Sequence, residues 1–126
     1  MNMTKLFLMV GTIGGFLSVA LGAFAAHALK ELLTEQLLAT FRTAVEYQFF
    51  HSLGLILIAL VLSQKPEVKF LKVAGIAMIT GILLFSGSLY ILAFTGLTSF
   101  GIITPFGGLA FLIAWLYFSL AVWKTY

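Results

Sequence analysis

Two histidines and one glutamate offer the most scope for chemistry among the side chains placed at apolar segments of this sequence. His27 closes a long apolar run, and Glu46 and His51 stand at the start of the next one. A histidine can ligate a metal or exchange a proton near neutral pH, and a nearby carboxylate can assist either role. The spacing of these three residues matches no metal-ligand motif. We therefore expect no metal and no other cofactor.

Hydroxyl and amide side chains accompany the histidines. In helices of alternating direction, late residues of one helix lie beside early residues of the next, so these groups should share the outer half of a membrane. Each is costly to place in lipid and therefore marks a functional or structural position. We predict that His27 and His51 lie at similar depth and join one network. The predicted polar cluster comprises His27, Glu46, Gln48, His51, Ser86, Ser88 and Thr104.

Two interpretations of this cluster stay open. It is either a site for a ligand, a metal ion or a proton, or a buried polar network that fixes the register of the helices. The second is favoured, because the residues lack a defined ligand spacing. No HExxH or GxSxG motif and no pair of carboxylates within one apolar run is present. We expect no catalytic residue and no enzymatic activity.

The composition places these residues in a membrane protein. Hydrophobic residues make up 62% of the 126 residues and charged residues only 9%, whereas a soluble domain carries roughly 25% charged residues. Such a chain cannot cover a surface that faces water. The net charge of +3 comes without a basic stripe, so we expect the lipid bilayer, and no nucleic acid, as a partner. Cysteine is absent, which excludes disulfides and thiolate sites.

Four apolar runs cover residues 6–29, 45–62, 70–94 and 105–123. A membrane-spanning helix needs roughly 20 apolar residues, and only helices or closed barrels satisfy their backbone in lipid. The predicted fold is an all-α membrane protein, a left-handed antiparallel bundle of four transmembrane helices in a single domain over residues 1–126. A cleaved signal peptide is the alternative for the first run, which exceeds the roughly 7–15 apolar residues of a signal core.

The segment 30–44 is polar enough to leave the membrane. Thr34 is suited to cap a helix that continues into the second apolar run, so we predict an amphipathic extension before helix two. The alternative is a separate amphipathic helix that lies flat on the bilayer. At the fourth run, Thr104 is predicted to cap the helix, with Pro105 in its first turn.

Basic residues predict the orientation. Lys30 and Arg42 lie on one side, and a larger group lies on the other: Lys5, Lys65, Lys69, Lys72 and Lys124. Cytoplasmic loops are enriched in Lys and Arg, so both termini are predicted to be cytoplasmic, in a bacterial plasma membrane.

Small residues should form the helix contacts. In lipid, close backbone approach stabilises helix pairs more than the burial of leucine does, and small residues permit it. Residues at spacings of three and four lie on one helix face. The residues predicted to pack are Gly11, Gly15, Ser18, Gly22 and Gly107.

Four segments of the sequence resemble a known family. They are GAFAAHAL at residues 22–29, YQFFHSL at 47–53, FSGSLY at 85–90 and TPFGG at 104–108. Together they are similar to the YgdD/YwdK-like small bacterial membrane proteins, a family whose domain has no known function. Ala25 departs from the glycine usual in that family. The resemblance implies four spans and implies no activity. It marks the family-pattern positions His27, Gln48, His51, Ser86, Ser88 and Thr104.

Three hypotheses for function follow, of which an enzyme that acts on a lipid or quinone has no specific feature in its support. The first is a non-enzymatic membrane component that acts through helix packing, with a protein partner, a second copy or lipids, in membrane integrity. The second is a small transporter or ligand-binding protein that uses the outer polar cluster. Small multidrug exporters have a similar size and rely on an acidic residue in the first span. Here no acidic residue precedes His27, which weakens that analogy.

Overall fold

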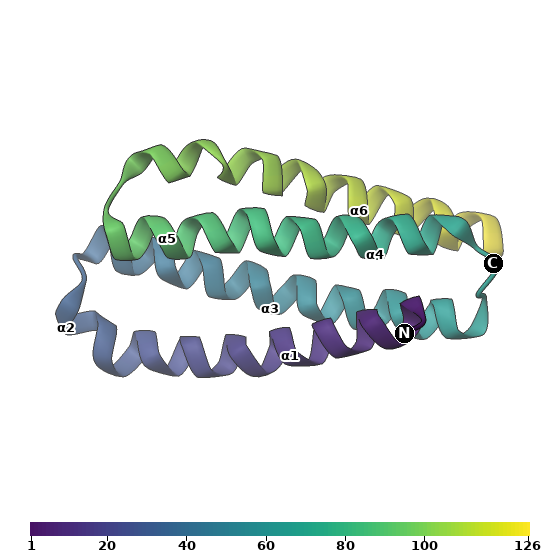
Figure 1. Cartoon of the computed structure of the whole chain (residues 1–126), viewed down its shortest axis with the longest axis horizontal. Coiled ribbons are helices and arrows are strands. Elements are labelled where there is room, and N and C mark those ends of the chain that lie inside the picture. Colours follow the sequence, from purple (N-terminus) through teal and green to yellow (C-terminus); the bar gives the residue numbers. More distant parts are fainter.

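The computed structural model describes residues 1–126, which form helices joined by short connections (Figure 1). Two short π-helical turns and one 3-10 turn interrupt or extend the α-helices. The elements are α1 (Met3–Phe24), η1 (Ala25–Leu29, π), α2 (Lys30–Leu32), α3 (Glu35–Gln64), α4 (Lys69–Gly81), η2 (Ile82–Ser86, π), α5 (Gly87–Thr95), η3 (Thr98–Ile102, 3-10) and α6 (Thr104–Thr125).

These elements form four rods, each long and apolar enough to cross a membrane: Met3–Leu32, Glu35–Gln64, Lys69–Thr95 and Thr98–Thr125. Successive rods run in opposite directions (Figure 1). The all-α four-helix membrane fold is therefore confirmed. All four rods extend beyond their apolar runs, because the flanking residues stay helical.

The second rod decides between the two alternatives for the segment before it. Helix α3 is continuous from Glu35 to Gln64, and the Thr34 hydroxyl accepts a hydrogen bond from the Leu37 amide at 3.2 Å. The amphipathic extension and its threonine cap are confirmed, and the separate surface helix is wrong. No proline or glycine lies between Glu35 and Gly54, so no residue in this segment ends the helix.

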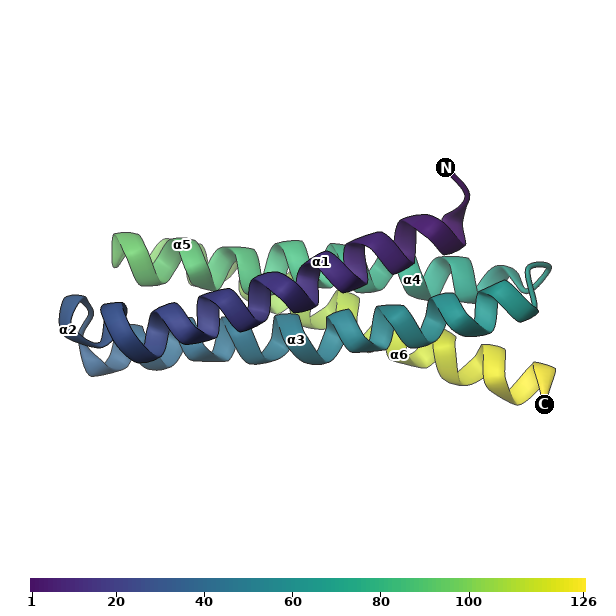
Figure 2. The ribbon, with the colours of Figure 1, turned by 90° about the horizontal axis from the view of Figure 1, so that it is seen from below.

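The helices are not packed equally against each other. Helix α1 lies along α3 and meets α4 only near its start, at Phe7, whereas α4 lies along α6. Helix α3 also contacts α4, η2 and α5, so it is the central element (Figures 1 and 2). One flank of α1 is therefore left facing η2 and α5 without close packing.

Large side chains lie against glycines in the main core cluster. Phe7 is fully buried, and a Cβ at Gly75 would collide with its ring. Phe111 lies in the same way against Gly81. A glycine opposite an aromatic ring lets two helices approach while the ring fills the space between them.

Two of the predicted glycine contacts are close. A Cβ at Gly11 would lie 3.0 Å from the Ser52 carbonyl oxygen, and one at Gly107 would collide with the Phe85 backbone. Gly22 makes an ordinary contact, since its Cβ would lie 3.6 Å from Val45.

The predicted contact of Gly15 is wrong. Nothing lies within 4 Å of a Cβ built on Gly15, whereas a Cβ on Gly14 would collide with the Ser52 hydroxyl. The face that α1 turns to the other helices passes through Phe7, which meets Gly75 of α4, and through Gly11 and Gly14, which meet Ser52 of α3. Ser18 continues this face: it is buried and donates to the Gly14 carbonyl at 2.8 Å. The observed face therefore keeps the predicted Gly11 and Ser18, and Gly14 takes the place of Gly15.

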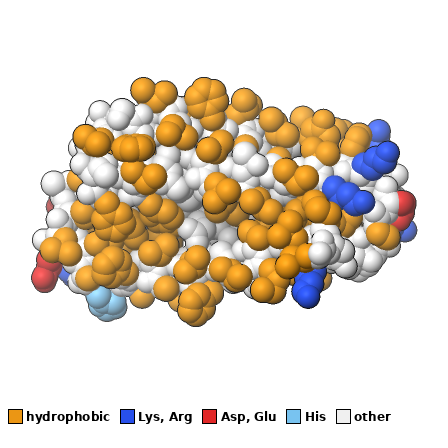
Figure 3. Space-filling model, in the orientation of Figure 1, with side chains coloured by type: hydrophobic (Ala, Val, Ile, Leu, Met, Phe, Trp, Pro, Cys, Tyr) orange, Lys and Arg blue, Asp and Glu red, His pale blue; other side chains and the backbone are white.

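The outer surface is mostly apolar. Figure 3 shows hydrophobic side chains over the length of one face, with most of its visible lysine and arginine side chains at the end where both termini lie. Phe16 and Leu112, both on membrane-spanning helices, are 73% and 69% exposed. Such a surface suits acyl chains and not water.

Candidate functional site

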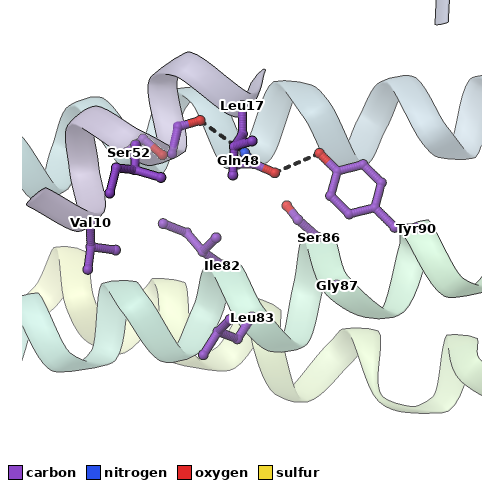
Figure 4. A pocket seen from close by; sticks show the side chains of 11 residues that line it. Val10, Leu17, Gln48, Ser52, Ile82, Leu83, Ser86, Gly87 and Tyr90 are labelled. Carbon is purple, nitrogen blue, oxygen red and sulfur yellow. Dashed lines mark hydrogen bonds between the residues drawn. The ribbon is translucent and has the colours of Figure 1, made fainter. Parts of the chain in front are cut away.

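The Gln48 carboxamide joins three helices. It lies on α3 and is only 6% exposed. Its Nε2 donates to the Gly14 carbonyl of α1 at 2.9 Å, and its Oε1 accepts from the Tyr90 hydroxyl of α5 at 2.7 Å (Figure 4). Because α1 and α5 pack poorly on each other, this side chain is the polar link between them.

The two serines around Gly87 link their segment to different neighbours. Ser86 donates to the Ala44 carbonyl of α3 at 2.8 Å. Ser88 donates to the Phe85 carbonyl at 2.9 Å and lies 2.6 Å from the Thr104 hydroxyl of α6. The predicted cap role of Thr104 is wrong, because Thr104 is the first residue of α6, Ile103 holds the N-cap position, and no side chain caps this helix.

His51, three residues after Gln48, contacts a different helix. Its Nδ1 lies 2.7 Å from the Tyr47 carbonyl. A carbonyl only accepts, so we assign the proton of the neutral ring to Nδ1. The ring stacks on Phe111 of α6 with centroids 3.6 Å apart and an interplanar angle of 17°. His51 therefore packs towards α6 and does not join the hydrogen bonds of Gln48.

His27 and Glu46, the other two titratable members of the predicted cluster, do not join the hydrogen-bond network. His27 and Glu46 are exposed. Ser52 lies against both Gly11 and Gly14, so His51 is near the level of these glycines, and His27 is displaced from it by about 20–24 Å at a rise of ~1.5 Å per residue. The prediction that the histidines share one depth and one network is wrong. Helix α3 pairs with α1 in a register that sets His51 deep and leaves His27 at the end of its rod.

Two residues outside the predicted cluster complete the site. Tyr90 supplies the hydroxyl that Gln48 accepts. Ser52 is fully buried, and its hydroxyl has no hydrogen-bond partner. Ser52 stands four residues after Gln48, the spacing that places two side chains on one helix face. That spacing is the signal by which the sequence points to Ser52.

A cleft of ≈ 340 Å³ lies where α1 faces η2 and α5, lined by 11 residues that include Gln48, Ser52, Ser86 and Tyr90. Figure 4 shows Gln48 and Ser52 on one wall and Ser86 on the other, with Tyr90 reaching across to Gln48. At its rim, Ile13 is 49% and Leu83 is 68% exposed. Both are apolar residues in spanning rods, so the opening faces lipid.

Gly87 leaves space in the cleft because it has no side chain. Its backbone is ordinary right-handed helix, with φ −58° and ψ −47°, and nothing lies within 4 Å of a Cβ built on it. Glycine inside a helix costs roughly 0.5–1 kcal/mol relative to alanine. Neither backbone conformation nor packing explains this glycine. Its position in the lining means that a side chain there would enter the cleft.

Comparison with known proteins supports the membrane assignment. Residues 21–108 match the family described as "Protein of unknown function (DUF423)". The chain is 41% identical over 120 residues to the UPF0382 membrane protein YwdK of Bacillus subtilis, covering 95% of this chain and 98% of that protein. It is 37% identical over 114 residues to the UPF0382 inner membrane protein YgdD of Escherichia coli, covering 90% and 86%. No solved structure matches.

Proposed function

The chain belongs to the DUF423 family of membrane proteins, and from this premise we propose that it is a non-catalytic protein that binds a lipid-soluble molecule in the cleft between α1 and α5. The proposal unites the lipid interaction of the first hypothesis with the ligand binding of the second. It replaces the outer polar cluster by the groups around Gln48.

The observation that carries the proposal is a polar floor in a cleft that opens to lipid. A purely structural network would be closed by packing, because unfilled space beside a helix forfeits van der Waals contacts. Here the helices on either side of Gln48 stay apart, and a volume of ≈ 340 Å³ remains between them. Small-molecule sites in proteins range from roughly 300 to 1,000 Å³.

The chemistry of the lining supports binding without catalysis. No lysine, arginine, histidine or acidic residue lines the cleft. The hydroxyls of Tyr90 and Ser86 are already donated to protein oxygens. General acid–base and nucleophilic catalysis need a group that transfers a proton or an activated nucleophile, and the lining offers neither.

We place the protein in the bacterial plasma membrane with both termini cytoplasmic. Relatives that match 90% or more of this chain are named membrane proteins, one of them an inner membrane protein. Five lysines at the end with the termini against one lysine and one arginine at the other support the orientation.

A pair of glycine substitutions tests the binding role. Gly87→Leu fills the cleft, whereas Gly15→Leu, the matched control, places the same side chain in a separate groove on α1 that Phe49 and Leu53 line. Neither glycine has an atom within 4 Å of its Cβ, so both variants should fold. Each protein is purified from membranes, and lipid-soluble molecules retained per chain are quantified by mass spectrometry.

The wild type and Gly15→Leu should retain the same species in equal amount, and Gly87→Leu should lose it. Equal retention by all three proteins, or no species enriched over bulk lipid in the wild type, would contradict the proposal.

A further inference from the structure

We propose that the molecule in the cleft is an uncharged lipid bearing a carbonyl group, whose oxygen accepts hydrogen bonds from Ser52 and Gln48. The inference rests on the proposed function and specifies the chemistry of its ligand. It follows from which hydrogen-bonding groups on the floor are already used and which are free.

The free groups are donors. The Gln48 Nε2 carries two hydrogens, and the Gly14 carbonyl accepts one of them. The Ser52 hydroxyl hydrogen has no acceptor. The hydroxyl hydrogens of Tyr90 and Ser86 are both taken by protein oxygens. Two unused donors therefore remain on the α3 side of the cleft.

Unused donors in an apolar setting call for an acceptor. A buried donor without a partner is rarer and costlier than an unused lone pair on oxygen. A carbonyl oxygen has two lone pairs and can accept from both donors at once. The Ser52 hydroxyl is enclosed by protein atoms beside Gly14 of α1, so its side chain must turn about χ1 before a group at the inner end of the cleft can accept from Ser52 and Gln48 together.

The packing around Ser52 leaves room for its hydroxyl. A Cβ at Gly14 would collide with the Ser52 oxygen, so the glycine leaves room for it beside α1. Yet the hydroxyl bonds to nothing in the protein, and alanine would serve packing there equally well. An unpartnered hydroxyl that the neighbouring helix accommodates, in the lining of a cleft, indicates a ligand contact.

The absence of charged residues from the lining and the depth of the cleft in the membrane further restrict the type of ligand. With no charged residue in the lining, an ionised group on the ligand would be desolvated without a partner. Gly14 lies about 14 Å along α1 from Lys5, at ~1.5 Å per residue, well inside an apolar layer roughly 30 Å thick. The carbonyl must therefore enter from within the membrane, with the apolar tail leaving past Leu83.

Ring carbonyls of quinones and ester carbonyls of neutral glycerolipids share this chemistry. The probes are a short-tailed benzoquinone and dioctanoylglycerol, with decane as a probe that has a tail and no carbonyl. Binding to purified protein in detergent is measured by titration calorimetry. The variants are Ser52→Ala, Gly87→Leu and, as matched control, Ser18→Ala, a buried serine that already has a partner.

Ser52→Ala should lower affinity for the carbonyl probe about five- to tenfold, the loss of one hydrogen bond of ordinary net strength. It should leave any binding of decane unchanged. Its melting temperature should equal or exceed that of the wild type, because no protein hydrogen bond is lost. Ser18→Ala should not change affinity. Binding of the quinone alone assigns a ring carbonyl, and binding of dioctanoylglycerol alone assigns an ester.

Three outcomes overturn the inference. If Gly87→Leu abolishes carbonyl-probe binding and Ser52→Ala leaves it intact, the carbonyl assignment is wrong and the proposed function stands. If neither carbonyl probe binds the wild type while decane does, the ligand lacks the predicted group. If binding survives Gly87→Leu, the cleft is not the site and both proposals fail.

Discussion

Replacing Gln48 with leucine tests whether its carboxamide holds three helices together. Leucine is similar in size and more apolar, so the substitution removes two hydrogen bonds with little change in volume. The Gly14 carbonyl would still accept from Ser18. The Tyr90 hydroxyl would lose its acceptor in a half-buried position.

The magnitude follows from those two partners. Hydrogen bonds between membrane helices average about 0.6 kcal/mol each, and a hydroxyl left without a partner costs roughly 1–3 kcal/mol. We therefore expect Gln48→Leu to lower the free energy of unfolding by about 2–4 kcal/mol. The gain in apolar character places the result towards the lower end.

The assay is reversible unfolding in mixed micelles with increasing dodecyl sulfate. Gln36→Leu, on the exposed first turn of α3, is the control for the added apolar surface. Tyr90→Phe and the double variant complete a thermodynamic cycle, whose coupling should be about 0.6–1.7 kcal/mol. A cost within ~0.5 kcal/mol of the control, or a coupling of zero, would show that Gln48 does not link α3 to α5.

Two further predictions address packing and topology. Gly107→Ala should lower the free energy of unfolding by roughly 1–3 kcal/mol, because its Cβ meets the Phe85 backbone. Gly15→Ala should raise the free energy of unfolding by up to about 1 kcal/mol. Thermal melts in detergent measure both variants, and an equal response of the two would contradict the packing described. Cysteines at Asn2 and Thr125 should be shielded from an impermeant thiol reagent in intact cells, and labelling of either from outside would disprove the cytoplasmic termini.

The helices could be predicted from the sequence because burial in lipid depends on composition along the chain. Apolar runs bounded by lysine and glutamate specify where a rod enters the membrane, and Thr34 marks the start of α3. The rotation of each rod about its own axis is harder to predict from the sequence. Gly14 and Gly15 differ by about 100° around the helix, and only the partner helix decides which of them is in contact.

The candidate site shows the same limit. Gln48, Ser86, Ser88 and Thr104 do form hydrogen bonds between helices, because a polar side chain in lipid must find a partner. Which partner it finds depends on the register between rods, and the register expected from the sequence wrongly placed His27 at the depth of His51. The cleft itself results from two helices that fail to meet, which no periodicity reveals. The handedness of the bundle stays a prediction.

Nuclear magnetic resonance of the labelled chain in lipid nanodiscs tests the open cleft most directly. The account predicts cross-relaxation from lipid or ligand protons to the Gln48 side-chain amide and the Gly87 backbone amide, in addition to exposed positions such as Phe16. The contradicting result is cross-relaxation at Phe16 alone, together with direct contacts between Leu17 and Leu83 that close α1 against α5.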